Sequence, residues 1–429
     1  FMLALVSATD AIMLGWIDQT SLSAVSLAGQ VQFVLSLFIS GIAAGAGIMA
    51  AQYWGKQDAA SIEKVIPIAL RTNLLFSGLF TILAGFCPEM LMRIFTNDAA
   101  LVASGSQYLR AVALSYVLCG ISQVYLILLK NTGHAAVSSR ISSTAVVLNI
   151  ILNAILIYGL CGAPALGIRG AAYATVAARV VELIWAYLET KKPERVRILW
   201  NRLFSSAGKI LSEDFWRYTL PVLAASLVWG IAYVLYSVIM GHMGSDAVAA
   251  NSITSIAKSL LSCLIRGVSG GAGVLIGNLL GANELEKARE YGGRLSHLSI
   301  AIGIVTGGLL MLISPAIVHF APLSDTAAEY LQYMLLFCGL NLMAQSVNTT
   351  VLDGIFCAGG DAKFDMQGNI GAMWCFSVPL GFLAAFWLKL PVMVVYCIVN
   401  LDEIVKLPAV YHHYKKYIWV RNITRDIED

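Results

Sequence analysis

The sequence predicts an all-α, polytopic membrane protein with twelve transmembrane helices in two pseudo-symmetric six-helix lobes. Three observations predict this fold: the composition, a series of long apolar runs, and an internal repeat. Of 429 residues, 58% are hydrophobic and only 12% are charged, whereas a soluble domain carries roughly 25% charged residues. This balance, with a mean hydropathy of +0.76, excludes soluble, disordered, collagen-like and coiled-coil proteins.

Twelve apolar runs can be cut at polar clusters, and most are long enough to cross about 30 Å of hydrocarbon at about 1.5 Å per residue. Their continuity favours helices over the short alternating segments of a β-barrel. The first run is short, which leads us to expect that the numbering begins partway into the first helix. The runs are 1–16, 24–51, 65–87, 108–130, 141–160, 167–189, 216–241, 247–278, 294–320, 329–357, 366–389 and 391–412.

Lysine and arginine gather in the loops after the even-numbered runs. By the positive-inside rule, both termini are expected to face the cytoplasm, and short loops favour a bacterial inner membrane. Residues 191–215 are basic and amphipathic, which predicts a cytoplasmic linker on the inner leaflet between an N-lobe of residues 1–190 and a C-lobe of residues 216–429. The net charge of +3 gives no indication of a nucleic-acid partner.

The two halves of the chain are related by an internal repeat. A shift of 226 residues aligns residues 15–55 with 241–281 without a gap and with 11 identities in 41 positions, including a shared G-x₃-G-x-G run. Because the copies are six spans apart, both halves are expected to insert with the same orientation around a cavity. This is the architecture of alternating-access transporters.

Several further motifs follow one another along the chain. They are Asp10–Gly15, the glycine-rich Gly41–Gly55 with its repeat copy, Asn149–Asn153 followed by Tyr158-Gly159, Gly162–Thr175, and Gly359-Gly360-Asp361. Through their order and duplication the chain resembles the MATE (multidrug and toxic compound extrusion) family over nearly its full length. The resemblance implies a secondary antiporter that exports bulky, often cationic compounds in exchange for Na⁺ or H⁺, with no cofactor. A monomer is expected, because the cavity lies within one chain.

The resemblance further implies a coupling-cation site, with Na⁺ as a candidate ion, formed by Asp10, Asn149, Asn153 and Thr175. An aspartate inside an apolar helix costs at least about 2.5–3.5 kcal/mol, so Asp10 must face protein or water. Asn149 and Asn153 lie one turn apart and project in the same direction. A structural hydrogen-bond acceptor at Asp10 and helix-packing asparagines are the alternatives. Other members carry acidic residues at the positions of Trp229 and Ser346, so their C-lobe site is expected to be absent.

A second polar set lies in the sixth and twelfth runs. Arg179 and Glu182 are spaced i,i+3, and Asp402 and Lys406 are spaced i,i+4 beside Glu403. Structural charge pairing is the favoured interpretation, because pairing makes burial of charge tolerable. A role of Asp402 or Glu403 in substrate contact or proton relay is the alternative.

Gln30, Trp229 and Lys258 are further candidates for a substrate cavity, and Lys258 and Arg266 could instead extend to the membrane interface. No H-E-x-x-H, G-x-x-x-x-G-K-[ST] or G-x-S-x-G motif is present, so neither an enzyme nor an ATP-driven pump is expected. The alternative function is a flippase of lipids or lipid-linked sugars with the same superfold. The sequence has few intramembrane lysines and arginines without an acidic partner, which argues against a flippase.

Overall fold

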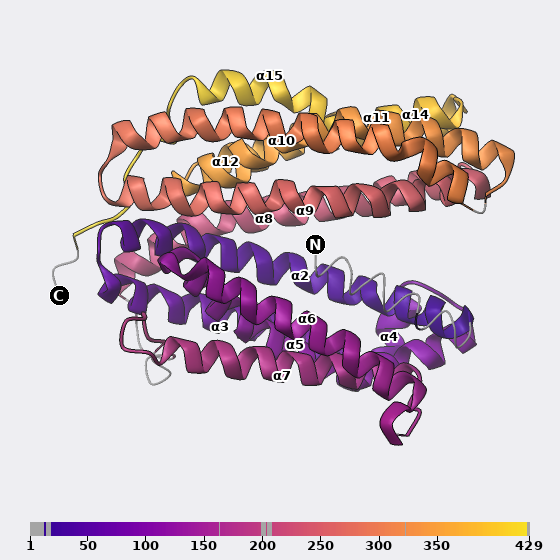
Figure 1. The fold of residues 1–429 in the computed structure, drawn as a ribbon, viewed down its shortest axis with the longest axis horizontal. Helices are drawn as coiled ribbons and strands as arrows, with labels where there is room; N and C mark the ends of the chain where they lie inside the picture. Colours follow the sequence, from indigo (N-terminus) through magenta and orange to yellow (C-terminus); the bar gives the residue numbers. More distant parts are fainter. Residues whose placement is uncertain are drawn as a thin grey trace. The chain divides into compact units, whose positions relative to one another are not determined.

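The computed structural model describes residues 13, 19–162, 164–198, 203, 208–321 and 323–426. All regular elements in these residues are helices (Figure 1), which confirms the all-α prediction. The helices are α2 (Gln19–Gly55), α3 (Ala59–Phe86), α4 (Pro88–Arg93), α5 (Ala99–Leu129), α6 (Ala135–Tyr158), α7 (Ile168–Thr190), α8 (Lys209–Gly241), α9 (Ser245–Gly281), α10 (Leu285–Phe320), α11 (Asp325–Thr349), α12 (Ala362–Asn369), α13 (Val378–Phe382), α14 (Val392–Val399) and α15 (Asp402–Tyr414).

Nine helical stretches of the described chain are long and apolar enough to cross a membrane. One stretch, Ala99–Tyr158, has 60 residues and contains both α5 and α6. The apolar run 391–412 is not one continuous helix, because α14 ends at Val399 and α15 begins at Asp402. The Asn341 side-chain amide donates a 2.6 Å hydrogen bond to the carbonyl of Asn400 at this break, which satisfies a backbone group that a helix end leaves free.

The described residues divide into two compact units. The first contains the chain up to Ala50 together with Asp58–Leu223, and the second contains Ala51–Gln57 together with the chain from Ala224. Helices α2 and α8 therefore each contribute residues to both units. Lys209, where α8 begins, lies within the segment that the sequence predicts as a linker.

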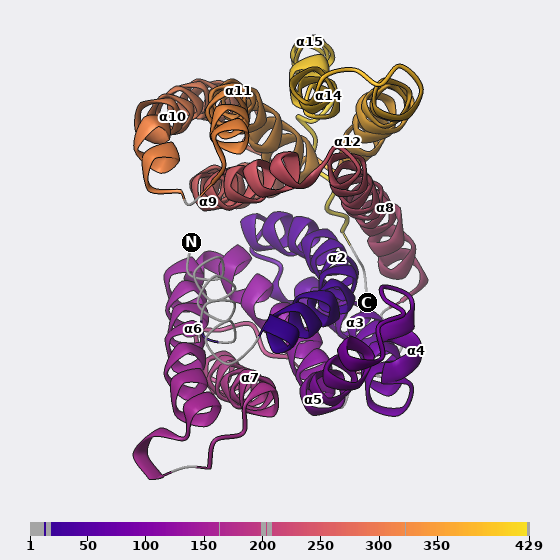
Figure 2. The same cartoon turned by 90° about the vertical axis from the view of Figure 1, so that its right-hand side faces the viewer.

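The first unit is organised around α5, which packs against α3 on one side and α7 on another, while α6 packs along α7 (Figure 2). The Asp98 carboxylate begins α5 by accepting hydrogen bonds from the first free backbone N–H groups, including that of Ala100 at 2.8 Å, as N-cap residues do. A turn at Gly133, with a φ of 79°, separates α5 from α6. Glycine adopts this left-handed conformation without steric cost.

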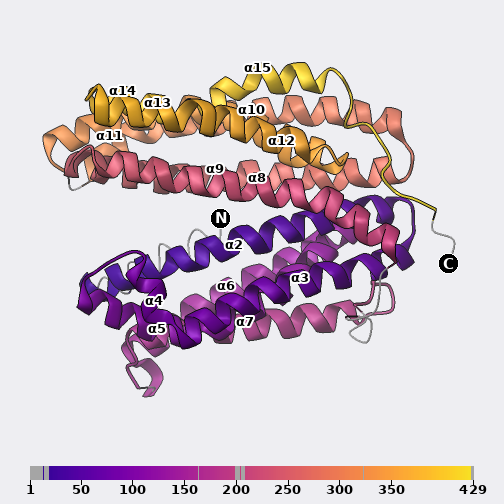
Figure 3. The ribbon, with the colours of Figure 1, turned by 180° about the vertical axis from the view of Figure 1, so that it is seen from behind.

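The second unit contains the bundle of α9, α10 and α11, which run side by side along their length (Figure 1). The segment from α12 through α13 runs as one bent rod (Figure 3) and forms a single candidate span, Ala362–Trp387. Trp419 is completely buried in the aliphatic and aromatic core that α9 and α10 form with residues 351–358, which follow α11. Burial of this ring fixes the C-terminal segment to the unit, because large aromatic side chains contribute much of a core's stability.

The repeat is visible in the helix boundaries. Under the 226-residue shift, the ends of α2 fall on the ends of α9, and both helices have 37 residues. The residues that follow these helices also correspond, since Gln57 has a φ of 63° and Asn283 has a φ of 60°. Non-glycine residues rarely adopt this conformation, so its occurrence at both copies indicates that the repeat extends to local backbone geometry.

Candidate functional site

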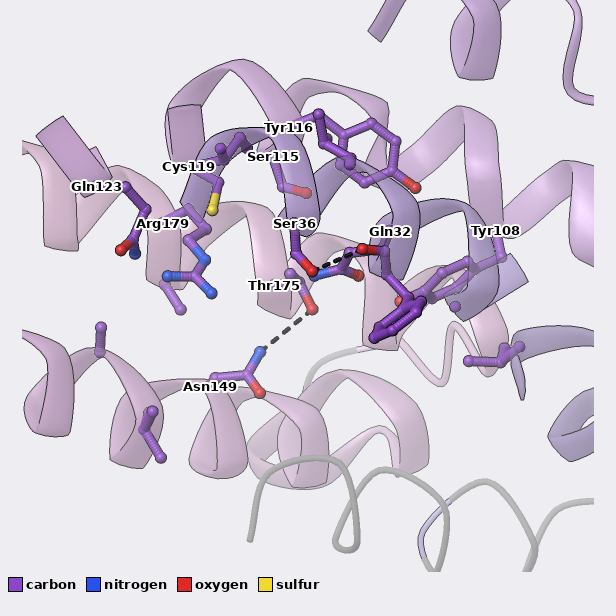
Figure 4. Close-up of a pocket in the computed structure, with 18 of the residues that line it drawn as sticks. Gln32, Ser36, Tyr108, Ser115, Tyr116, Cys119, Gln123, Asn149, Thr175 and Arg179 are labelled. Atoms are coloured by element: carbon purple, nitrogen blue, oxygen red, sulfur yellow. Dashed lines mark hydrogen bonds between the residues drawn. The ribbon is translucent and has the colours of Figure 1, made fainter. Parts of the chain in front are cut away.

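Three of the four residues predicted for the coupling site meet between α6 and α7. The Asn149 amide donates to the Thr175 hydroxyl at 3.3 Å, and the Asn153 amide donates to the Asn149 side-chain oxygen at 3.3 Å. Asn149 and Asn153 are buried, as their one-turn spacing on α6 suggests. Figure 4 shows Asn149 and Thr175 pointing toward each other from their two helices. Asp10, the fourth residue, lies outside the described residues.

A cavity of about 730 Å³ adjoins this triad. Asn149 and Thr175 both line it, and so does Gln30, which the sequence analysis named as a cavity candidate. The wall comes from α2, α5, α6 and α7 (Figure 4). Cavities of roughly 300–1,000 Å³ are the size that drug-like ligands occupy.

The charged part of the cavity wall is an internally paired group on α5 and α7. The Arg179 guanidinium donates to Glu182 at 2.7 Å, and Glu182 is 2% exposed. The hydroxyl of Ser122 donates to the other carboxylate oxygen of Glu182 at 2.8 Å. A buried carboxylate with both oxygens partnered is tolerated in a low-dielectric interior. The charge of Arg179 is thereby balanced, and the described cavity wall carries no net formal charge.

Sequence reasoning missed most of the uncharged polar wall. Tyr116 is 1% exposed, lines the cavity, and has a hydroxyl with no hydrogen-bond partner among the described residues. The sequence does contain a pattern that could have predicted part of this wall, because several α2 wall residues recur at helical spacing on one face. The α2 wall residues with this spacing are Ser26, Gln30, Phe33, Ser36 and Ser40.

A second polar cluster lies in the second unit, around Lys406 of α15. The ammonium is 3.3 Å from a Glu403 oxygen and 3.6 Å from an Asp402 oxygen, and all three residues are at most 9% exposed. It also donates to the side-chain oxygen of Asn369 at 3.1 Å. The structure thus pairs Asp402 and Glu403 with Lys406.

Two further polar side chains extend this cluster to α11 and α12. The Asn348 amide donates to Glu403 at 2.8 Å, and the Asn369 amide donates to the Asp365 carboxylate at 3.1 Å. Sequence reasoning missed Asn348, Asp365 and Asn369, because they converge from helices far apart in the chain. In the described chain, no group of three or more histidine, cysteine or acidic side chains has a metal-binding arrangement.

Trp229 and Lys258, the remaining cavity candidates, also lie in the second unit and not with the triad. The Lys258 ammonium donates to the Asn341 side-chain oxygen at 2.8 Å. Trp229 stacks on Tyr233 and lies under the guanidinium of Arg266. The predicted cavity residues are therefore distributed over both units.

The sequence of the chain is similar to one known protein family and to curated bacterial proteins. The family model described as MatE matches residues 1–155 and 221–383. The chain is 22% identical over 419 residues to "Probable multidrug resistance protein YoeA" of Bacillus subtilis, covering 96% of this chain and 89% of that protein. It is 24% identical over 390 residues to "Probable multidrug resistance protein NorM" of Agrobacterium fabrum, covering 89% of this chain and 83% of that protein.

Solved structures show the same fold. A structure described as the outward-facing conformation of a multidrug resistance MATE family transporter of the MOP superfamily matches with a TM-score of 0.87 and 19% identity. The match covers 97% of this chain and 92% of that chain. A transporter of the MOP superfamily from Pyrococcus furiosus matches with the same TM-score of 0.87 and 19% identity, over the same shares of the two chains.

Proposed function

The chain belongs to the MATE family of multi-pass membrane transporters, which are not enzymes, and we propose that it is a secondary antiporter that exports bulky, often cationic compounds in exchange for Na⁺ or H⁺. One observation carries the proposal: Asn149 and Thr175 belong both to the polar triad and to the cavity wall. An ion and an organic compound that contact the same side chains influence each other's binding, which exchange requires.

The ion would bind at Asp10 with the triad. A carboxylate with amide and hydroxyl oxygens is a ligand set that suits a hard monovalent cation, and Asp10 alone can instead take a proton. Both amide hydrogen bonds of the triad measure 3.3 Å, longer than the usual 2.7–3.2 Å, so they are weak. Rotation of the Asn149 amide toward an arriving ion therefore costs little.

The organic compound would occupy the cavity of about 730 Å³. Its wall offers hydroxyl and amide groups with a balanced ion pair, so shape and hydrogen bonding would select compounds more than charge does. The multidrug resistance names of the relatives support drug-like substrates. Ion binding at Asp10 would favour the conformation that releases the compound, and ion release would restore the other conformation.

The sequence and the helices together support a membrane arrangement of twelve spans. The nine candidate spans become ten when α5 and α6 are counted separately. We count the broken pair α14 and α15 as an eleventh span, and we infer a twelfth from the apolar run of residues 1–16 in the sequence. We infer two lobes of six spans, with both termini and the basic segment 191–215 in the cytoplasm. We also infer a monomer.

A vesicle assay tests the function. Purified protein in liposomes loaded with ethidium should release the dye when an inward Na⁺ or H⁺ gradient is applied, and should not release it without one. In the same vesicles, a fluorescent phospholipid should stay in its leaflet. Lipid flipping without ion-driven dye efflux would contradict the proposal and favour the flippase alternative.

A further inference from the structure

A patch of aromatic and cationic side chains on the second unit has no part in the function described above. The guanidinium carbon of Arg266, on α9, lies 5.6 Å from the centre of the Trp229 ring, on α8. Trp229 stacks on Tyr233, one turn further along α8, with ring centroids 5.5 Å apart and an interplanar angle of 17°. Trp229 thus has both the guanidinium of Arg266 and the phenol ring of Tyr233 as neighbours.

The charge of Arg266 needs an explanation, because it lies near the middle of a helix that is long and apolar enough to span the membrane. Its side chain is exposed on the unit, and it forms no ion pair with a carboxylate of the described chain. An unpaired arginine in hydrocarbon costs at least about 2.5–3.5 kcal/mol. Placement toward a water-filled space avoids this cost, and it would make the patch accessible to a dissolved compound.

The neighbouring charges are engaged or opposite in sign. Lys258, two turns earlier on α9, is held by the Asn341 side chain. Lys406 is paired with Glu403 and Asp402. Asp353, in the π-helical turn Thr350–Phe356, is exposed and close enough to interact electrostatically with Arg266. Arg266 is therefore the cation of this face that lies against the aromatic pair of Trp229 and Tyr233.

We propose that Arg266, Trp229 and Tyr233 form a binding site for the aromatic, anionic part of exported compounds. The proposal extends the substrate class beyond cations and rests on the proposed export function only for the transport step. A guanidinium held against an indole face keeps its outer N–H groups free, and these match the two oxygens of a carboxylate.

The aromatic rings supply the second part of the recognition. A planar ring system attached to the carboxylate can stack on Tyr233 or on the edge of Trp229, where aromatic pairs gain energy beyond the burial of area. Asp353 limits the site, because its carboxylate repels an anion that approaches Arg266. Removal of Asp353 should therefore strengthen the binding of anions, whereas removal of Arg266 should weaken it.

Two dyes with the same xanthene ring system and opposite charge provide the test. Fluorescein is an anion at neutral pH, and rhodamine 6G, whose carboxyl group is esterified, is a cation. Fluorescence polarisation with detergent-purified protein, corrected with empty micelles, gives the dissociation constant of each dye. Arg266→Gln should weaken fluorescein binding about tenfold, the loss expected for a hydrogen-bonded charge pair. It should leave rhodamine 6G binding unchanged or stronger.

Asp353→Asn gives a result of opposite sign. It should strengthen fluorescein binding and weaken rhodamine 6G binding, an outcome that a general disturbance of the fold does not produce. Trp229→Ala should weaken both dyes, because both stack, and Arg266→Lys should retain part of the fluorescein affinity. Equal fluorescein affinity in the wild type and in Arg266→Gln would overturn the proposal.

Controls separate a local effect from misfolding and from failure of the export function. Arg140→Gln and Trp185→Ala change exposed residues of the first unit and should leave the affinity for both dyes unchanged. All variants should elute as one symmetrical species on size exclusion. If Arg266→Gln does not, Arg266→Lys and Asp353→Asn carry the test. The binding measurement needs no ion gradient, so it stands even if ethidium efflux is absent.

Discussion

Lys406 neutralises a buried group of carboxylates, and its replacement by methionine should strongly destabilise the second unit. Methionine keeps the volume of the side chain and removes its charge. The ammonium lies 3.3 Å from Glu403 and 3.6 Å from Asp402, so each attraction amounts to about 5 kcal/mol at an effective dielectric constant of about 20. Part of this gain offsets desolvation, and breaking such a buried pair typically costs about 3–5 kcal/mol.

Thermal unfolding of purified protein, followed by tryptophan fluorescence, measures the effect. The melting temperature of Lys406→Met should lie far below that of the wild type. Lys416→Met changes an exposed position and should have the melting temperature of the wild type. Adding Glu403→Gln to Lys406→Met should recover part of the loss. The glutamine removes an unpaired charge but keeps an oxygen for the Asn348 amide. Equal melting temperatures of Lys406→Met and Lys416→Met would show that the charge of Lys406 does not stabilise the cluster.

Three further predictions concern packing, the C-terminal segment and topology. Gly45→Ala should lower the stability of the protein by about 1–3 kcal/mol, because a Cβ there would lie 2.7 Å from the Cα of Thr219. At its repeat counterpart Gly271, no atom lies within 4 Å of such a Cβ. In thermal melts, Gly271→Ala should therefore be neutral or stabilising. Gln52→Leu removes a buried amide that donates to the carbonyl of Ala358 at 2.7 Å and accepts from the N–H of Ile423 at 2.8 Å. Limited proteolysis should therefore cleave the C-terminal segment of this variant faster than that of Gln367→Leu, a control at an exposed position. A cysteine introduced at position 205 should resist an impermeant thiol reagent on intact cells, and ready labelling would invert the proposed topology.

The helices could be predicted well because long apolar runs and a gapless repeat are local signals. The break between α14 and α15 could not, because the hydrogen bond that accompanies it, from Asn341 to the carbonyl of Asn400, joins residues far apart in the sequence. The same limit applies to the sites. Asn149 and Asn153 are visible as a pair one turn apart, whereas Asp365 and Asn348 join Lys406 only through folding. The sequence shows Arg266 as a charged residue within an apolar run, but the spacing of residues does not show that it lies against the ring of Trp229.

Ion-driven efflux by Asp10→Asn tests the central claim most directly. The substitution keeps the shape of the side chain and removes its charge, and Asp325→Asn, at an exposed position at the start of α11, serves as the matched control. The account predicts that Asp10→Asn folds and binds ethidium but loses efflux under both a Na⁺ and a H⁺ gradient, while Asp325→Asn retains it. Wild-type efflux by Asp10→Asn under both gradients would contradict the account and place the coupling site elsewhere.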